Sequence, residues 1–216
     1  MLWYGCRVLY WKHIVELSQK ITMNKRVKSN TIRIISGQWK GRKVEVLDAE
    51  GLRPTTDRAR ETLFNWLMFD VQGARCLDLF AGSGVLGLEC LSRGAKFVQF
   101  VEVNQGSATQ LKRTLEAFKA EGDAVKVTQQ SFESVLAKPE NEPYDLVFLD
   151  PPFKSEYLAS AIELLSQPGW LAESAVIYIE QSSIADAIKV PNGWAEHRRK
   201  KSGQSLSVLY RLESSD

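Results

Sequence analysis

From residue 74 onward, short apolar runs alternate with longer stretches that carry helical periodicity. The apolar runs have strand length, and they are continuous rather than alternating with polar residues. A strand that is apolar on both faces is typical of a parallel sheet with helices on both sides. The predicted strands are Cys76–Phe80, Phe97–Val101, Val125–Thr128, Leu146–Leu149 and Val176–Ile179.

The stretches between these strands predict helices. In Asn104–Glu121 the apolar residues recur every three or four positions, and Gly122 is placed to end the helix. A second helix is predicted to start at Ser155 as its N-cap and to run toward Pro168. Alternating strands and helices predict an α/β fold with a doubly wound, mostly parallel sheet, whose ligands bind at the carboxyl ends of the strands.

Both ends of this pattern depart from it. Thr31–Ser36 and Lys43–Leu47 alternate apolar and polar residues around two glycines, which predicts a small antiparallel hairpin. A helix with capping residues near Asp57 is expected to follow it. Ala195–Lys201 and Ser205–Leu212 flank a glycine and predict an antiparallel hairpin at the edge of the sheet.

A chain of 216 residues is long enough for one main domain with a small appendage. We expect residues 1–30 to form a poorly ordered extension, 31–70 the hairpin and helix, and 71–216 the main domain. Met23 is a plausible natural start, which would place residues 1–22 outside the protein. No run approaches the roughly 20 apolar residues of a membrane span, and residues 1–21 lack the apolar core and cleavage site of a signal peptide.

The net charge of +2 is unevenly distributed. Lys25–Arg60 carries +6, whereas the rest of the chain carries −4. A basic segment on a mildly acidic body indicates a polyanionic partner, although charge alone slightly favours a solvated loop. His197–Lys201 is a second basic cluster, which either extends such a surface or coats an edge strand. The candidate RNA contacts in the first segment are Lys40, Arg42, Lys43, Arg53 and Arg58.

Cysteine and histidine usage disfavours disulfide and metal chemistry. Cys6, Cys76 and Cys90 form no CxxC pair, and two of them lie in apolar segments, which predicts buried free thiols in a reducing compartment. With only His13 and His197, metal catalysis through imidazole is not expected.

The first motif is the run Asp78-Leu-Phe-Ala-Gly-Ser-Gly-Val-Leu-Gly87, in which a predicted strand passes through a glycine turn into a helix. Its glycines match a dinucleotide fingerprint, and Glu102 ends the next strand, where a carboxylate can bind ribose hydroxyls. This spacing suits an NAD enzyme as well as a methyltransferase. Asp78 favours a cationic ligand such as S-adenosyl-L-methionine, because a carboxylate there would repel a pyrophosphate; the alternative is that it only caps the turn.

The second motif is Leu146-Val-Phe-Leu-Asp-Pro-Pro-Phe153, a buried strand that ends in a carboxylate, two prolines and a ring. Asp150 and a neighbouring carbonyl could accept the two hydrogens of an exocyclic base amine, while Phe153 stacks on the base. Such contacts would orient the nitrogen toward a methyl donor, without a metal or a covalent intermediate. The structural alternative is a strand exit stiffened by proline, with a buried phenylalanine.

The two motifs together resemble the amino-group methyltransferases of the Rossmann-like class I type. Residues 35–43 (ISGQWKGRK) and 52–64 (LRPTTDRARETLF) are similar to the bacterial RsmD family, which methylates guanine N2 in 16S ribosomal RNA. The likeness runs in order from about Thr31 to about Leu212. It implies S-adenosyl-L-methionine as cofactor and guanine 966 as target. It further implies 16S rRNA in an assembling 30S particle as partner, and a cytoplasmic monomer.

The resemblance also implies roles for individual residues. After the third strand, where such enzymes often have Asp or Asn for the adenine amine, this chain has Ser131 followed by Phe132. The residues expected to hold the cofactor are Asp78, Phe80, Gly82, Gly84, Glu102, Ser131 and Phe132. Those expected at the target base are Asp150, Pro151, Pro152 and Phe153.

Three alternatives remain open at this level. The methylated amine could belong to a DNA adenine or cytosine or to a protein glutamine, since the second motif admits all of these. An NAD-dependent oxidoreductase fits the glycine spacing but leaves Asp78 and Asp150 without a role. A non-catalytic RNA-binding module is disfavoured because every expected catalytic position is filled.

Overall fold

The structure is a computed structural model, and it describes residues 30–46, 57–120, 122–139, 142–152, 156–186 and 188–213. The predictions made for residues 1–29, for Arg53 and for Phe153 lie outside these residues. In the described part of the chain, no helix is both long and apolar enough to cross a membrane.

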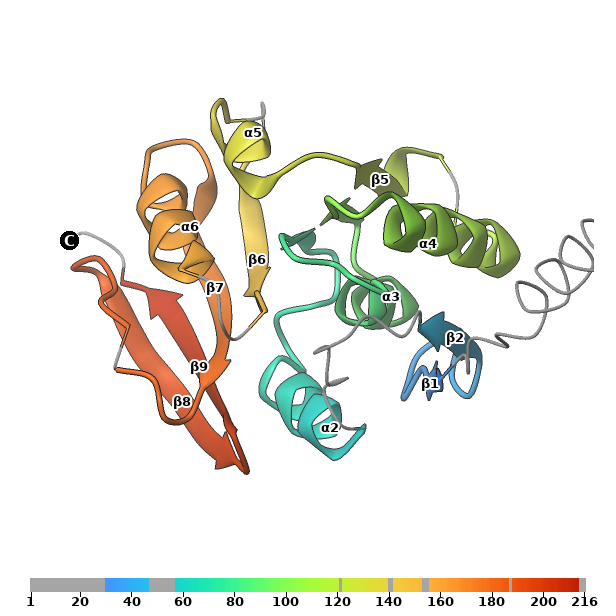
Figure 1. The fold of residues 1–216 in the computed structure, drawn as a ribbon, viewed down its shortest axis with the longest axis horizontal. Helices are drawn as coiled ribbons and strands as arrows, with labels where there is room; N and C mark the ends of the chain where they lie inside the picture. Colours follow the sequence, from blue (N-terminus) through green and yellow to red (C-terminus); the bar gives the residue numbers. More distant parts are fainter. Residues whose placement is uncertain are drawn as a thin grey trace, which may run out of the picture.

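The described residues form a seven-stranded sheet in the order β5-β4-β3-β6-β7-β9-β8 (Figure 1). Strands β3 to β7 pair in parallel, and β9 pairs antiparallel with both β7 and β8. The doubly wound sheet with an antiparallel edge hairpin is therefore confirmed. Its strands are β3 (Arg75–Asp78), β4 (Phe97–Val101), β5 (Val125–Thr128), β6 (Tyr144–Leu149), β7 (Leu171–Ser182), β8 (Trp194–Ser202) and β9 (Ser205–Leu212).

Both faces of the sheet are buried, and successive residues of a strand enter two different cores. In β6, Leu146 and Phe148 face one core, while Val147 and Leu149 face the other. The first core includes α2 (Asp57–Trp66), α3 (Val85–Ser92) and α4 (Gln105–Phe118), and the second includes α5 (Phe132–Leu136) and α6 (Tyr157–Leu165). Cys76 and Cys90 are buried free thiols, as expected.

Two helix boundaries differ from those predicted. Helix α4 ends at Phe118, because Lys119 adopts a left-handed conformation with φ 58°. The N–H of Ala120 then reaches the carbonyl of Leu115 at 2.9 Å, which closes the helix before Gly122. Helix α6 has Glu156 rather than Ser155 at its N-cap, and Glu156 makes no side-chain capping bond.

The predicted N-terminal hairpin is confirmed, with shorter strands. Strands β1 (Asn30–Arg33) and β2 (Lys43–Val46) pair antiparallel, and the hairpin contributes Ile34 and Trp39 to the first core. A side chain at Gly37 could not be accommodated there, because its Cβ would lie 1.8 Å from the Ser92 carbonyl oxygen of α3. The hairpin is therefore fitted closely against α3 (Figure 1).

A buried ion pair joins α2, α3 and the hairpin. Arg60 of α2 and Glu89 of α3 are both fully buried, and Arg60 Nη1 lies 3.0 Å from Glu89 Oε1. Arg60 Nη2 donates to the Arg33 carbonyl and to the Asp57 carboxylate. Glu89 also accepts the N–H of Ile35 at 2.6 Å. Arg60 thus pairs with a residue 29 positions away in the sequence.

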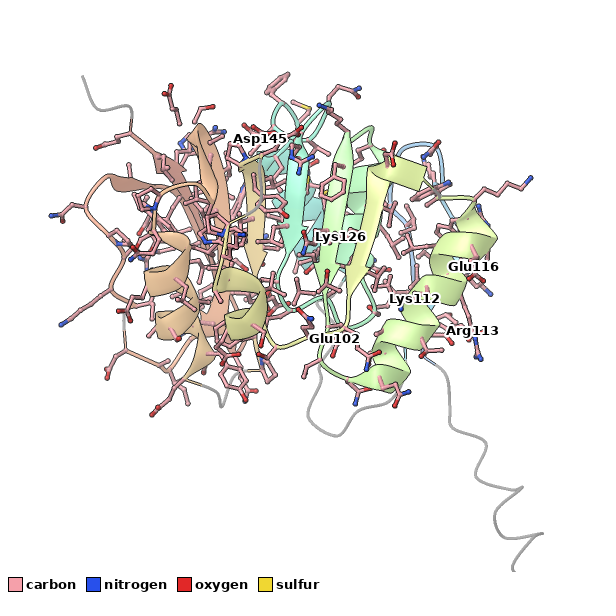
Figure 2. All side chains as sticks on the ribbon, turned by 90° about the horizontal axis from the view of Figure 1, so that it is seen from above. Glu102, Lys112, Arg113, Glu116, Lys126 and Asp145 are labelled. Carbon is pink, nitrogen blue, oxygen red and sulfur yellow. The ribbon has the colours of Figure 1, made fainter. Side chains whose placement is uncertain are left out.

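Replacing Glu89 with alanine is expected to lower the free energy of unfolding by about 3–5 kcal/mol, because the buried Arg60 charge then keeps only the exposed Asp57 carboxylate as its partner. Urea unfolding followed by circular dichroism measures this loss. Glu116→Ala removes a carboxylate from the exposed outer face of α4 (Figure 2) and is the matched control. Equal, small losses for both variants would contradict a central role for the pair.

Candidate active site

The two sequence motifs meet at one edge of the sheet. Strands β3 and β6 are parallel neighbours with Asp78 opposite Phe148, so the glycine turn after β3 lies beside the Asp-Pro-Pro exit of β6. Strand β4 runs parallel on the other side of β3 and delivers Glu102 to the same edge. Figure 2 shows Glu102 at this edge and Asp145, at the amino end of β6, at the opposite edge.

These strand ends line a cleft of about 370 Å³. Of the predicted residues, the cleft is lined by Phe80, Gly82, Glu102, Ser131, Phe132, Asp150 and Pro152. The same cleft is also lined by Leu79, Val101, Val103, Asn104, Ser107, Gln130, Glu133 and Tyr157. Predicted cofactor residues and predicted target-base residues therefore share one cavity.

Glu102 braces the glycine turn through its carboxylate. Its Oε2 accepts the Gly82 N–H at 2.7 Å, and its Oε1 accepts the Asn104 N–H at 2.6 Å. Each carboxylate oxygen has two acceptor sites, so each retains one for a ligand. Glu102 thus fixes the turn and can still accept hydrogen bonds from a diol in the cleft.

The three glycines of the first motif have different surroundings. A Cβ at Gly82 would meet nothing within 4 Å, so its backbone borders open space in the cleft. A Cβ at Gly84 would lie 2.4 Å from Leu111 of α4, and one at Gly87 would lie 2.3 Å from Phe100 of β4. Gly82 therefore leaves room for a ligand, whereas the other two let α3 pack closely against its neighbours.

Asp78 lies beneath the glycine turn and is not among the residues that line the cleft. It is only 3% exposed, and its Oδ2 accepts the Gly87 N–H at 3.1 Å. Burial raises the pKa of Asp78 from 3.8 to about 7; the Gly87 hydrogen bond opposes this rise and the Glu102 charge adds to it. The carboxyl group thus anchors the start of α3 to the end of β3.

An aromatic wall closes one side of the cleft. The ring centroids of Phe80 and Phe132 lie 5.3 Å apart, and Tyr157 lies 5.4 Å from Phe132 and 6.4 Å from Phe80. Sequence reasoning missed Tyr157, although an aromatic residue four positions beyond Phe153 was a signal for it. Such a wall offers flat apolar faces to a planar ligand.

Ser131 lies at the N-cap of α5. Its hydroxyl oxygen accepts the Ser134 N–H at 3.3 Å, and the Ser131 and Ser134 hydroxyls lie 3.1 Å apart. Among the described residues that line the cleft, Asn104, Ser107 and Gln130 supply further polar side chains. Asn104 follows Glu102 by two positions, and this proximity in sequence could have identified it.

The charge of the cleft is entirely negative among the described residues that line it. Glu102, Glu133 and Asp150 are acidic, and no lysine, arginine or histidine accompanies them. A pyrophosphate would be repelled by this lining, whereas a cation would be attracted. The site therefore suits S-adenosyl-L-methionine, which carries a sulfonium and an ammonium, better than a dinucleotide.

The exit of β6 separates the cleft from a second cavity. Asp150 is half-buried and Pro152 is exposed, and both line the cleft. Pro151 is buried and lines only the second cavity, together with residues of α6 and of the end of β7. Beside this exit, burial raises the pKa of Tyr178 well above its ordinary value, and the Glu180 and Asp150 charges raise it further.

The predicted RNA contacts fall into two groups. Lys40, Lys43 and Arg58 are exposed. Arg42 is engaged within the fold, because its Nη2 donates to the Ala117 carbonyl at 2.6 Å and its guanidinium lies 3.8 Å from the centre of the Phe118 ring. Its charge therefore stabilises the end of α4.

Comparisons with known proteins place this architecture among methyltransferases. The family model described as "Conserved hypothetical protein 95" matches residues 32–211. The chain is 47% identical to "Ribosomal RNA small subunit methyltransferase D" of Escherichia coli, over 86% of this chain and 92% of that protein. The protein of the same name from Haemophilus influenzae is also 47% identical, over 84% and 92%. A solved structure, "Putative methyltransferase yhhF from Escherichia coli", is 45% identical, with a TM-score of 0.76 over 86% of this chain and all of that chain.

The raised pKa of Asp78 predicts a pH-dependent loss of stability. The folded state holds the Asp78 proton up to about pH 7, whereas the unfolded state releases it near pH 3.8, so the free energy of unfolding falls as the pH rises from about 3.8 to about 7. Between pH 5 and pH 8 this amounts to roughly 3 kcal/mol. Asp78→Asn keeps the acceptor for Gly87 and should lack this decline. Parallel stability–pH curves for the two proteins, from urea unfolding, would refute the assignment.

Proposed function

The chain belongs to the RsmD family of ribosomal RNA methyltransferases, and from that premise we propose that it methylates the exocyclic N2 amine of a guanine in small-subunit ribosomal RNA. The observation that carries the proposal is the shared cleft, which is lined by Asp150 and Pro152 as well as by Gly82 and Glu102. A methyl donor and an acceptor amine held at these two groups would be neighbours.

The residues of the cleft fit S-adenosyl-L-methionine. Glu102 can accept hydrogen bonds from the ribose hydroxyls, while Gly82 allows close approach of the ligand to the backbone. Phe80, Phe132 and Tyr157 offer their faces to the adenine ring. When bound, this cofactor supplies an electrophilic methyl group on a positively charged sulfur, and the acidic lining favours that charge.

Asp150 acts on the acceptor side of the reaction. Its carboxylate accepts a hydrogen bond from the guanine N2 amine and thereby directs the nitrogen lone pair toward the methyl group. The nitrogen–carbon bond would form as the sulfur–carbon bond of the donor breaks, and the Asp150 carboxylate would receive the proton that the amine loses. The stiff Pro151–Pro152 exit fixes the direction of this carboxylate.

Other substrates are disfavoured by particular observations. The acidic lining of the cleft disfavours a dinucleotide and hence an oxidoreductase. A glutamine substrate would leave the exposed Lys40, Lys43 and Arg58 without a purpose, whereas an RNA phosphate backbone matches their charge. We further propose that the target is guanine 966 of 16S rRNA, in an assembling 30S particle, and that the enzyme is a cytoplasmic monomer.

Glu102→Ala is expected to weaken cofactor binding about 10- to 100-fold, because hydrogen bonds to a charged group contribute about 1.5–3 kcal/mol. Calorimetric titration with S-adenosylhomocysteine measures this without requiring RNA or turnover. Asp123→Ala, which removes an exposed carboxylate in the short 3-10 helix Gly122–Ala124, should bind normally. Unchanged affinity of the Glu102 variant, or tight binding of NAD by the wild type, would refute the cofactor assignment.

Asp150→Ala is expected to lower kcat at least 100-fold and leave cofactor affinity within about threefold, since general-base and positioning contributions are of this size. Transfer of labelled methyl groups to small-subunit rRNA from cells that lack the enzyme measures the rate. Mass spectrometry of the hydrolysed product should show N2-methylguanosine.

RNA carrying inosine at the modified position lacks the N2 amine and should accept no methyl group. Methylation of that inosine RNA, or a different methylated nucleoside in the product, would exclude guanine N2. Near-normal turnover by the Asp150 variant would remove the role given to this carboxylate.

A further inference from the structure

A small groove lies between α2 and the C-terminal hairpin, apart from the acidic cleft. Its volume is about 170 Å³, and in Figure 1 α2 lies next to the strands β8 and β9 that form its other wall. The groove is lined by Arg58, Ala59, Thr62, Leu63, Trp66, Lys200, Ser202 and Ser207. It brings together two basic segments that are about 140 residues apart in the sequence, through a 2.8 Å hydrogen bond from Lys200 Nζ to Thr62 Oγ1.

The groove has the opposite charge to the cleft. Arg58 and Lys200 are its cations, and among the described residues that line it there is no carboxylate. The Thr62 hydroxyl donates to the Arg58 carbonyl at 3.0 Å, and the Ser207 hydroxyl lies 3.0 Å from that of Tyr178, so Ser202 supplies the hydroxyl donor for a ligand. Two cations beside a hydroxyl group suit a phosphate group.

The two cations differ from their basic neighbours in sequence. Arg60 is buried in its ion pair with Glu89, and Arg199 is held by both oxygens of Glu196 at 2.8 and 2.5 Å. Among the described residues, no ion pair forms to Arg58 or Lys200. Their charges are therefore available for an external anion, whereas those of Arg60 and Arg199 are largely neutralised within the fold.

The spacing of the lining residues makes a continuous wall on each side. Arg58, Thr62 and Trp66 follow one another at intervals of four along α2, so they share one face of the helix. Lys200 and Ser202 are two positions apart on β8 and share one face of the strand. The half-buried Trp66 provides an aromatic surface at the end of the α2 wall.

The sheet connects this groove to Asp150 by a single row of residues. Lys200 pairs with Ser207, and Ser207 pairs with Glu180. Asp150 follows Leu149, which pairs with Ile179, so it lies beside Glu180. Three steps between strands, each about 4.8 Å, separate Lys200 from Asp150 by roughly 14 Å. A few nucleotides of an extended RNA strand can cover that distance.

We propose that the groove between α2 and β8 binds a backbone phosphate of the RNA strand that flanks the target nucleotide, with Arg58 and Lys200 as its cationic contacts and Trp66 as a stacking surface. This inference rests on the proposed function for the identity of the RNA. The groove holds the flanking strand while the target base enters the acidic cleft, where a phosphate would be repelled. It acts on RNA affinity and not on the chemical step.

The test compares two substitutions at adjacent positions of β8. Lys200→Gln removes the charge in the groove and keeps a hydrogen-bond donor, while Lys201→Gln makes the same change on the opposite face of the strand. Filter binding of unmodified small-subunit rRNA transcript is measured over a range of salt concentrations. Each lost contact to a single strand should reduce the slope of log affinity against log salt by about 0.7.

Lys200→Gln is expected to bind the transcript about tenfold more weakly at low salt, the loss of one charge-assisted hydrogen bond, with the reduced slope. Lys201→Gln should match the wild type, and Lys200→Arg should restore binding. Arg58→Gln combined with Lys200→Gln should reduce the slope by about twice as much. S-adenosylhomocysteine affinity should stay unchanged in all of them, which also shows that the variants are folded.

Equal effects of Lys200→Gln and Lys201→Gln would overturn the proposal, because β8 would then attract RNA only through its overall positive charge. No effect of either substitution would also overturn it, because β8 would then not contact RNA. Loss of cofactor affinity in Lys200→Gln with no recovery in Lys200→Arg would also overturn it, because the residue would then be structural. The salt dependence of RNA binding is measured without turnover. A failure to form N2-methylguanosine would therefore refute the proposed function, and the binding measurements would still decide whether the groove binds RNA.

Discussion

The pairing of β6 beside β3 is the constraint on which the site depends. The chain adds β4 and β5 on one side of β3 and then crosses over to lay β6 on the other, so the winding of the sheet reverses next to β3. The loops at such a reversal separate and leave a crevice at the carboxyl ends of the strands. Here that crevice holds the glycine turn, Glu102 and Asp150. Two motifs separated by some 70 residues become neighbours because β3 and β6 pair in parallel.

Separation of charge organises the surface around this crevice. The cleft is lined by carboxylates without a described cation, and the groove beside α2 is lined by cations without a described carboxylate. These two surfaces match the two partners of an rRNA methyltransferase reaction: the acidic cleft suits a cationic cofactor, and the basic groove suits a polyanionic substrate. The arrangement also directs RNA phosphates away from the cofactor and toward the flanking surface.

The N-terminal hairpin is attached to the sheet by buried polar contacts as well as by apolar packing. Arg60 and Glu89 are fully buried, and each also makes a hydrogen bond to the hairpin backbone, at Arg33 and Ile35 respectively. A buried charge pair is costly unless its partners are in place, so it specifies one orientation of the hairpin on α3. The contact of Gly37 with Ser92 imposes the same orientation sterically. The exposed Lys40 and Lys43 are thereby presented from a rigid support.

The sequence determined the order of strands and helices, the antiparallel hairpins near its two ends and the motif residues, because hydrophobic periodicity and turn chemistry are local properties. It also identified seven of the residues that line the cleft, such as Gly82, Glu102 and Asp150, since their places after strands follow from chain order.

Only the tertiary structure decided what each charged residue does. Arg58 and Arg60 are two positions apart, yet one is exposed and the other buried against Glu89. Tyr157 joined the aromatic wall, and Lys200 met Thr62, through contacts between elements distant in the sequence. Burial and ion pairing depend on neighbours across the fold, and no local pattern encodes them.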